Sequence, residues 1–200
     1  MNTYFVEKAK MTLAGVSIRT TNEAEMGPDG GLSQLWETYF QSNIAGQIAT
    51  VNPEYIYALY TDYESDANGA YTVVIGHEVA EERHIEGRQL EEGELEENEL
   101  VESELEESKL EKSELEESEL EESELVENQF TYAAVPESKY MVFKTIKGPV
   151  FEVVVQAWGE IWAYFKESGE VRTYTGDFEI YDSRNFDPAD TQVEIYIAIE

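Results

Sequence analysis

The sequence predicts an α+β fold built from two similar units, each a strand, a helix and two more strands. Three observations support this. Short β-rich runs recur along the chain, and two longer stretches place apolar residues at helical spacing. A third is that the same order of elements appears before and after a Glu-rich tract. Two such units are expected to pair with pseudo-twofold symmetry, so that their antiparallel sheets form a ligand cleft.

The first unit is expected to begin with an extended run, followed by a loop rich in Gly, Pro and Asp. A helix should come next, because its apolar residues recur at steps of three and four. Two strands then follow, joined by a turn that contains Asn68-Gly69, a pair typical of hairpins. The predicted ranges are Tyr4–Arg19 for the extended run, Thr20–Gly31 for the loop, Leu32–Ile44 for the helix, and Tyr55–Tyr63 and Tyr71–Val79 for the strands.

The second unit repeats this order after the Glu-rich tract. Pro149 is expected at the start of its helix, where the missing N–H does no harm, and Gly169 is expected as a left-handed stop. The predicted ranges are Phe130–Val135 and Tyr140–Ile146 for two strands, 149–168 for the helix, and Asp177–Asp182 and Val193–Ile199 for the closing strands. Residues 1–82 and 129–200 should therefore form one domain, and residues 83–128 an insertion.

The insertion is strongly acidic and has a Leu at every fifth position from Leu90 to Leu125. Residues 86–127 contain 20 Glu and three basic residues, a net charge of −17 out of −31 for the chain. A period of five forms no stripe on an α-helix, but it suits a pentapeptide-repeat-like right-handed β-helix with each Leu inside. The alternative is a disordered acidic linker, which blocks of like charge usually form.

Charge and composition exclude several function classes. A net charge of −31 without a Lys/Arg cluster argues against nucleic acid and anionic membranes as partners. With no Cys and no ligand motif around His77 or His84, neither a metal site nor a cofactor is expected. The chain has no apolar run long enough to span a membrane and no signal peptide at its start, so a cytoplasmic protein is expected.

The segments outside the tract resemble the GyrI-like effector-binding family. The first half contains LW…YF, YALYTDYESD and YTVVIGHEV, and the second contains VPESKYMVFKTIKGPV, AWGEIWAYF, DFEIYD and VEIYIAI. This family supplies the ligand-binding module of AraC-type and MerR-type multidrug regulators and also occurs as single-domain proteins. Two departures are clear: the sequence shows no helix-turn-helix, and the family core has no acidic insertion at this position.

The resemblance implies an aromatic cleft with a buried Glu, here Glu179, suited to small hydrophobic or cationic aromatic ligands. Tyr181 should share its strand face. Trp36 and Trp158 are expected to flank the ligand, although core packing is the commoner role of a Trp at helical spacing. The remaining candidate ligand-binding residues are strand tyrosines that offer both a flat face and a hydroxyl: Tyr57, Tyr71 and Tyr140.

Three functions fit these features. The first is a stand-alone module that senses or sequesters amphipathic, cationic aromatic compounds. The second is a hydrolase of strained electrophilic natural products, in which Glu179 acts as general base and Tyr181 or Tyr140 as general acid. The third is a gyrase-type or other protein-interaction role through the acidic tract. The sequence favours the first and leaves the other two open.

Overall fold

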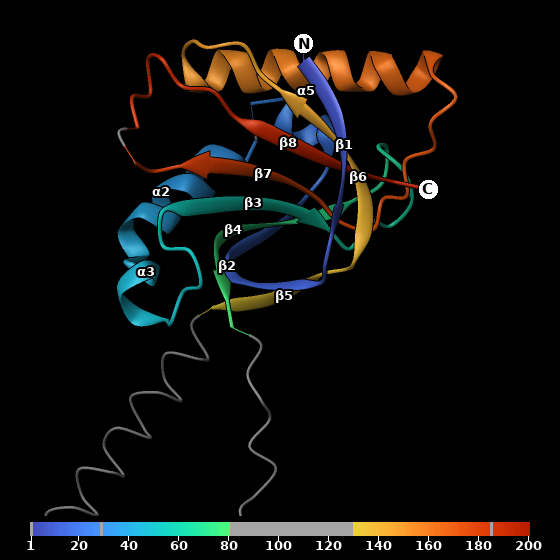
Figure 1. Ribbon diagram of the computed structural model, residues 1–200. Helices are drawn as coiled ribbons and strands as arrows, with labels where there is room; N and C mark the ends of the chain where they lie inside the picture. The colour runs from blue at the N-terminus through green and yellow to red at the C-terminus, as the bar shows by residue number, and fades with distance from the viewer. Residues whose placement is uncertain (1, 29, 81–129, 185) are drawn as a thin grey trace, which may run out of the picture. The chain divides into compact units, whose positions relative to one another are not determined.

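The computed structural model describes residues 2–28, 30–80, 130–184 and 186–200, so the predictions for the acidic tract lie outside the described residues. In the described ranges, the strands form one antiparallel eight-stranded sheet with the order β1-β6-β8-β7-β3-β4-β2-β5 (Figure 1). The α+β class is therefore confirmed. One continuous sheet replaces the separate sheets that were expected, because β3 of the first half pairs directly with β7 of the second.

The elements of the first half follow the predicted order, with more helical structure than expected. The loop after β2 contains a short helix, whose first turn is capped by the Thr21 side chain accepting from Ala24 N. The bounds are β1 Asn2–Lys8, β2 Met11–Thr20, α1 Asn22–Glu25, α2 Leu32–Ser42, α3 Ile44–Gln47, β3 Tyr55–Thr61 and β4 Tyr71–Val79.

The second half agrees with its predicted ranges to within two residues at every boundary. Its long helix begins directly after Pro149 and ends before Ser168, whose backbone is extended. The bounds are β5 Thr131–Val135, β6 Ser138–Lys144, α5 Val150–Glu167, β7 Asp177–Asp182 and β8 Glu194–Ile199. None of the helices in the described ranges is long and apolar enough to cross a membrane.

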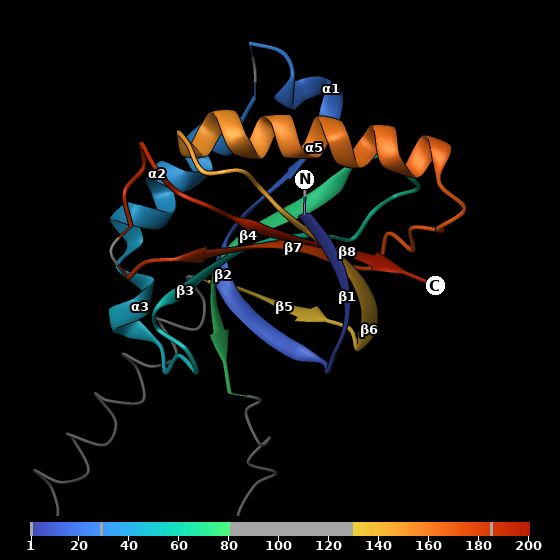
Figure 2. The same cartoon turned by 45° about the horizontal axis from the view of Figure 1, so that its top comes forward.

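The predicted extended run Tyr4–Arg19 is two strands with different partners. β1 pairs with β6, whereas β2 pairs with β4 and β5. Only Ala9 and Lys10 separate β1 from β2, although β1 is the first strand in the order and β2 is the next to last. The two ends of the sheet must therefore come close together, and the sheet is strongly curled (Figures 1 and 2).

Two predicted helix ends differ from the structure. The helix expected to reach Ile44 breaks at Asn43, whose left-handed backbone (φ 49°) separates α2 from α3. Asn tolerates this conformation because its short side chain can bond locally. Gly169 was expected to be a left-handed stop, but no glycine in the described ranges has a positive φ. The α5 helix ends instead as the Ser168 backbone turns to an extended conformation.

The curled sheet has two faces with different coverings. Helices α2 and α5 lie on its outer face (Figure 2). The inner face encloses the main apolar cluster, in which alternate residues of each strand point inward. The members of that cluster are Leu13, Tyr57, Leu59, Val74, Val135, Tyr140, Val142, Phe178, Tyr196 and Ala198. The residues of opposite parity on the same strands therefore face the helices.

Candidate functional site: a buried carboxylate beneath two helices

Strand β7 places a carboxylate on the helix-covered face of the sheet. Phe178 belongs to the inner apolar cluster, so Glu179, the next residue, points to the opposite face. Glu179 lies opposite Ala58 of β3 and Ile195 of β8, and its side chain is only 1% exposed. A carboxylate is thus held in the middle of the sheet, beneath helices rather than in water.

Three side chains from three different elements donate hydrogen bonds to this carboxylate. Oη of Tyr60 on β3 lies 2.9 Å from it, Nε1 of Trp158 on α5 lies 2.6 Å away, and Oη of Tyr181 on β7 lies 2.5 Å away. All three donors are neutral, and none of the ion pairs in the described ranges includes Glu179. The carboxylate is well hydrogen-bonded, but no cation among the described residues forms an ion pair with it.

This environment shifts the protonation of every group in it. Burial raises the pKa of the Glu179 carboxyl above its usual value, and the hydrogen bonds from Tyr181, Trp158 and Tyr60 oppose that rise only in part. Burial, together with the nearby carboxylate, raises the pKa of the Tyr60 and Tyr181 hydroxyls well above 10. Both tyrosines therefore remain donors at neutral pH, and the site favours an added positive charge.

Aromatic rings surround the carboxylate. Trp36 on α2 meets Tyr181 edge-to-face at 5.1 Å between centroids, and Trp158 meets Tyr60 at 5.0 Å. Tyr71 on β4 extends this group of rings. Its ring lies 5.9 Å from that of Tyr60, and its hydroxyl donates to Asn22. Both tryptophans are half-buried, so each has a surface that solvent can reach. The rings form a wall around Glu179 on the outer face of the sheet.

A buried ion pair lies next to this wall. Arg172 donates to Asp177 at 2.6 Å, and both side chains are at most 6% exposed. Asp177 also accepts from Tyr63 Oη and Ala198 N. The guanidinium lies 4.6 Å from the centroid of the Tyr174 ring and 5.6 Å from that of Trp158. The cation nearest the site is therefore already balanced by Asp177 rather than by Glu179.

The model of the GyrI-like small-molecule-binding domain matches residues 1–200. The chain belongs to the GyrI-like family. It is 28% identical over 188 residues, 94% of this chain and 91% of the relative, to a candidate transcriptional regulator, YobU of Bacillus subtilis (strain 168).

Solved structures show the same GyrI-like fold. An integron cassette protein from the mobile metagenome of Vibrio cholerae, VCH_CASS2, is 26% identical with a TM-score of 0.60, covering 99% of this chain and 95% of that one. The protein SAV2435, solved bound to tetraphenylphosphonium, is 16% identical with a TM-score of 0.63, covering 100% of this chain and 94% of that one. At 16% identity, the similarity to SAV2435 shows only that the two proteins share a fold.

The structure brings five of the seven predicted ligand-binding residues of this GyrI-like domain to one face of the sheet. Glu179, Tyr181, Trp158, Trp36 and Tyr71 form a connected group of hydrogen bonds and ring contacts with Tyr60.

Tyr57 and Tyr140 do not lie in this group. Tyr57 is opposite Ile180, so it points into the curl, and its hydroxyl donates to Glu78. The Tyr140 ring packs against Phe178 in the inner cluster. Both were predicted to lie at the site from residue type alone. Because side chains alternate between the two faces of a strand, their positions in β3 and β6 direct them to the inner face.

Sequence reasoning missed Tyr60 and the Arg172–Asp177 pair. The run Tyr55–Tyr63 contains Tyr at four positions, and only the pairing of β3 with β7 decides which of them faces Glu179. Asp177 could have been found, because it stands two residues before Glu179 on the same strand and so shares its face.

Of the two histidines, His77 lies in the described part of the chain, where it contacts a neighbouring helix. His77 is buried and forms a 2.8 Å hydrogen bond with Tyr39 Oη, which joins β4 to α2, while His84 lies outside the described ranges. Burial lowers the pKa of His77, so its imidazole is neutral at neutral pH. No group of metal-ligating side chains occurs in the part of the chain that the structure describes.

Proposed function

We propose that this GyrI-like domain binds amphipathic aromatic cations at Glu179, and so senses or sequesters them. The observation that carries the proposal is the buried Glu179 carboxylate, which has three neutral donors and no cationic partner. A buried carboxylate gains most from a ligand that brings a positive charge, because the low local dielectric strengthens the attraction. Trp36 and Trp158 add ring faces to which a flat cation is attracted.

The position of the site supports the same proposal. We propose that the two halves are related by pseudo-twofold symmetry, because β2-β4-β3 and β6-β8-β7 have the same order in their halves and β3 pairs with β7 between them. Tyr60 comes from the first half and Glu179 from the second. A site at the junction of two units is a common place for a ligand pocket.

Ligand entry requires side chains to move. Glu179 is 1% exposed, so a cation can reach it only when some of its three donors swing aside. Trp36 is the best candidate for the first movement, because it is half-buried on α2 and contacts Tyr181 by ring packing. Glu179 would then exchange a neutral donor for a charged ligand. SAV2435, which shares this fold at 16% identity, was solved bound to tetraphenylphosphonium, and this supports the proposal that the fold can hold such a cation.

The test is a titration with tetraphenylphosphonium followed by tryptophan fluorescence, since two of the chain's three Trp residues border Glu179. Saturable quenching is expected in the natural protein. In Glu179→Gln the affinity should fall by at least about tenfold, or about 1.4 kcal/mol, because the charge partner is lost while the shape is kept.

Two controls separate charge recognition from unspecific apolar binding. Tetraphenylborate has the same shape and the opposite charge, and it should not quench. Tyr57→Phe alters a residue on the other face of the sheet, and it should bind tetraphenylphosphonium like the natural protein. Equal affinity for both ions, or equal affinity in Glu179→Gln, would contradict the proposal.

Hydrolysis of a strained electrophile is a second candidate function. It is favoured by one observation: the Tyr181 hydroxyl lies 2.5 Å from Glu179, so an acid and a base stand side by side. Tyr140, the other candidate acid, lies on the opposite face of the sheet. Loss of turnover in Glu179→Gln with ligand binding retained would support the hydrolase over simple binding.

A further inference from the structure

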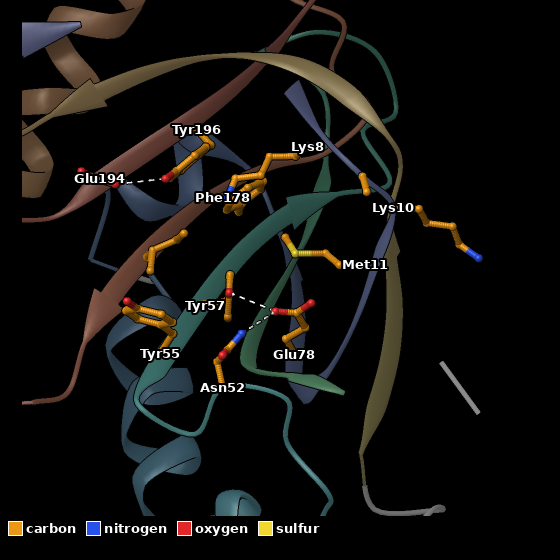
Figure 3. Close-up of a pocket in the computed structure, with 12 residues that line it drawn as sticks. Lys8, Lys10, Met11, Asn52, Tyr55, Tyr57, Glu78, Phe178, Glu194 and Tyr196 are labelled. Atoms are coloured by element: carbon orange, nitrogen blue, oxygen red, sulfur yellow. Dashed lines mark hydrogen bonds between the residues drawn. The ribbon is translucent and has the colours of Figure 1, made fainter. Parts of the chain in front are cut away.

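A cavity lies on the inner face of the sheet, opposite to the face that carries Glu179. It has a volume of about 400 Å³, and the connection between β1 and β2 forms part of its lining (Figure 3). Its walls come from that connection and from β3, β4, β7 and β8. Because successive residues of β7 face opposite sides, Phe178 and Ile180 line this cavity while Glu179 and Tyr181 point away from it.

The floor of the cavity is aromatic. Tyr57, Phe178 and Tyr196 line it, and each of these side chains is at most 5% exposed. Phe178 and Tyr196 are stacked, with centroids 4.6 Å apart and planes inclined by 11°. Such a floor offers an apolar surface against which a ring or a short alkyl chain can pack.

One wall of the cavity carries the Glu78 carboxylate (Figure 3). It accepts hydrogen bonds from Tyr57 Oη and Asn52 Nδ2, both at 3.3 Å. Hydrogen bonds to a carboxylate are normally shorter than this, at about 2.5–2.9 Å. No ion pair in the described ranges includes Glu78. The carboxylate therefore retains capacity for a closer, charged donor.

The opposite charge is present in the lining of the same cavity, on Lys8. The Lys8 ammonium lies 5.2 Å from the centroid of the Tyr196 ring, and among the described residues it belongs to no ion pair. Glu194, the other carboxylate in the lining, is already bonded to Lys144 at 3.1 Å. One cavity thus contains an anion and a cation that do not pair with each other.

We propose that this cavity binds a small amphoteric molecule, with an ammonium group on Glu78, a carboxylate on Lys8 and an apolar spacer on the aromatic floor. Each end of such a ligand would complete an ion pair that the protein leaves open. The two sites then differ in what they recognise: the Glu179 site takes a bulky cation, and the inner cavity takes a zwitterion. The inner site is separate from the proposed function, because it lies on the other face of the sheet.

The probe is 4-(aminomethyl)benzoate, which carries an ammonium and a carboxylate at opposite ends of one ring. It is titrated into the full chain labelled with ¹³C on the methionine methyl groups. Met11 lines the cavity, whereas Met141 shares its strand face with Phe143, whose ring packs on Tyr164 of α5, and Met26 is 74% exposed. The Met11 methyl signal should shift and saturate, while those of Met141 and Met26 stay in place.

Variants and half-ligands test each end of the proposed pose. Glu78→Gln and Lys8→Gln should each weaken binding by about tenfold, because each removes one ion pair. Lys139→Gln is the matched control: it removes the same charge from an exposed lysine that lies opposite Glu7 in the register of β1 and β6, outside the cavity lining. Benzylamine and benzoate, which carry one charge each, should bind at least about tenfold more weakly than the probe.

Two results would overturn the proposal: no shift of the Met11 signal at saturating probe, or equal weakening by Lys8→Gln and Lys139→Gln. Neither depends on the Glu179 site. Tetraphenylphosphonium binding that survives in Glu78→Gln would leave the proposed function intact even if the probe fails. Probe binding that survives in Glu179→Gln would show that the inner cavity acts by itself.

Discussion

At the scale of single residues, Glu179 and Asp177 show two ways to hold a charge inside a sheet. Asp177 is 0% exposed and is paired with Arg172 at 2.6 Å. Glu179 is equally buried, but only neutral groups donate to it. Burying a carboxylate without a cation costs folding free energy, because water is replaced by a medium of lower dielectric. Glu179 is thus a residue whose charge destabilises the protein in the absence of a ligand.

This cost predicts how stability depends on pH. The folded pKa of Glu179 is raised above the unfolded value near 4.5, so the folded state binds the proton more tightly than the unfolded state. The penalty is absent below the unfolded pKa and fully present above the raised folded pKa. Glu179→Gln should therefore be more stable than the natural protein at neutral pH, on the order of 1 kcal/mol or a few degrees in Tm.

The measurement is thermal unfolding of both proteins from pH 7 down to pH 4.5. The difference in Tm should shrink as the pH falls, because protonated Glu179 resembles Gln. Burial lowers the pKa of His77, so the natural protein and the variant should both lose stability below about pH 6.5, and this change cancels in the difference. A difference that grows on acidification would show that Glu179 is stabilised as an anion.

At the scale of elements, β2 and β4 approach each other closely at one pair of glycines. Gly15 on β2 and Gly76 on β4 lie directly opposite each other. A Cβ on Gly76 would stand 1.9 Å from the Ala14 carbonyl oxygen, and one on Gly15 would stand 2.2 Å from that of Ile75. These neighbours are backbone atoms, so they cannot give way as a flexible side chain would. The two strands approach closely here because neither residue has a side chain.

Gly76→Ala is therefore expected to destabilise the protein strongly, on the order of 3 kcal/mol or more, because β2 and β4 must separate. Gly159→Ala on α5 is the matched control. A Cβ there meets nothing within 4 Å, and Ala favours a helix over Gly by about 1 kcal/mol. Urea unfolding should show opposite shifts of the midpoint for the two variants. A Gly76→Ala protein as stable as the natural one would mean that the close approach is not required.

The elements also show what could be predicted from the sequence. Strands β4 and β7 begin and end as predicted, because each is a β-branched and aromatic run bounded by turn residues. The break at Ala9-Lys10 was missed, because no Gly or Pro marks it. It is set by pairing: β1 joins β6 and β2 joins β4, and those contacts are far away in the sequence.

The candidate site, like the fold, could be predicted from the sequence except where it depends on how distant strands pair. Glu179 and Tyr181 share one face by strand alternation alone, and α5 supplies Trp158. Tyr57 and Tyr140 lie outside that group, and the sequence does not show which face of its strand a tyrosine presents. That information lies in the register between strands, which places Ala58, rather than Tyr57, opposite Glu179.

At the scale of the whole molecule, the strands that flank the acidic insertion are tied to the same partner. β4 and β5 both pair with β2, one on each side, with Val79 opposite Thr12 and Thr131 opposite Gly15. The two strand ends are therefore separated by two strand spacings and about three residues along β2, about 14 Å in all. A linker of about six residues can span that distance, since an extended chain covers about 3.3–3.6 Å per residue.

Replacing residues 81–129 by such a Gly/Ser linker should leave the fold and the Glu179 site unchanged, with a Tm within a few degrees of the natural value. Residues 86–127 carry −17 of the net charge of −31, so the full chain should attract tetraphenylphosphonium more strongly at low salt. That advantage should disappear near physiological ionic strength, where charges more than about 8 Å apart are screened. Titrations of both proteins at low and physiological salt test this directly. A shortened protein that fails to bind at either salt concentration would show that the tract contributes to the site itself rather than to its surrounding field.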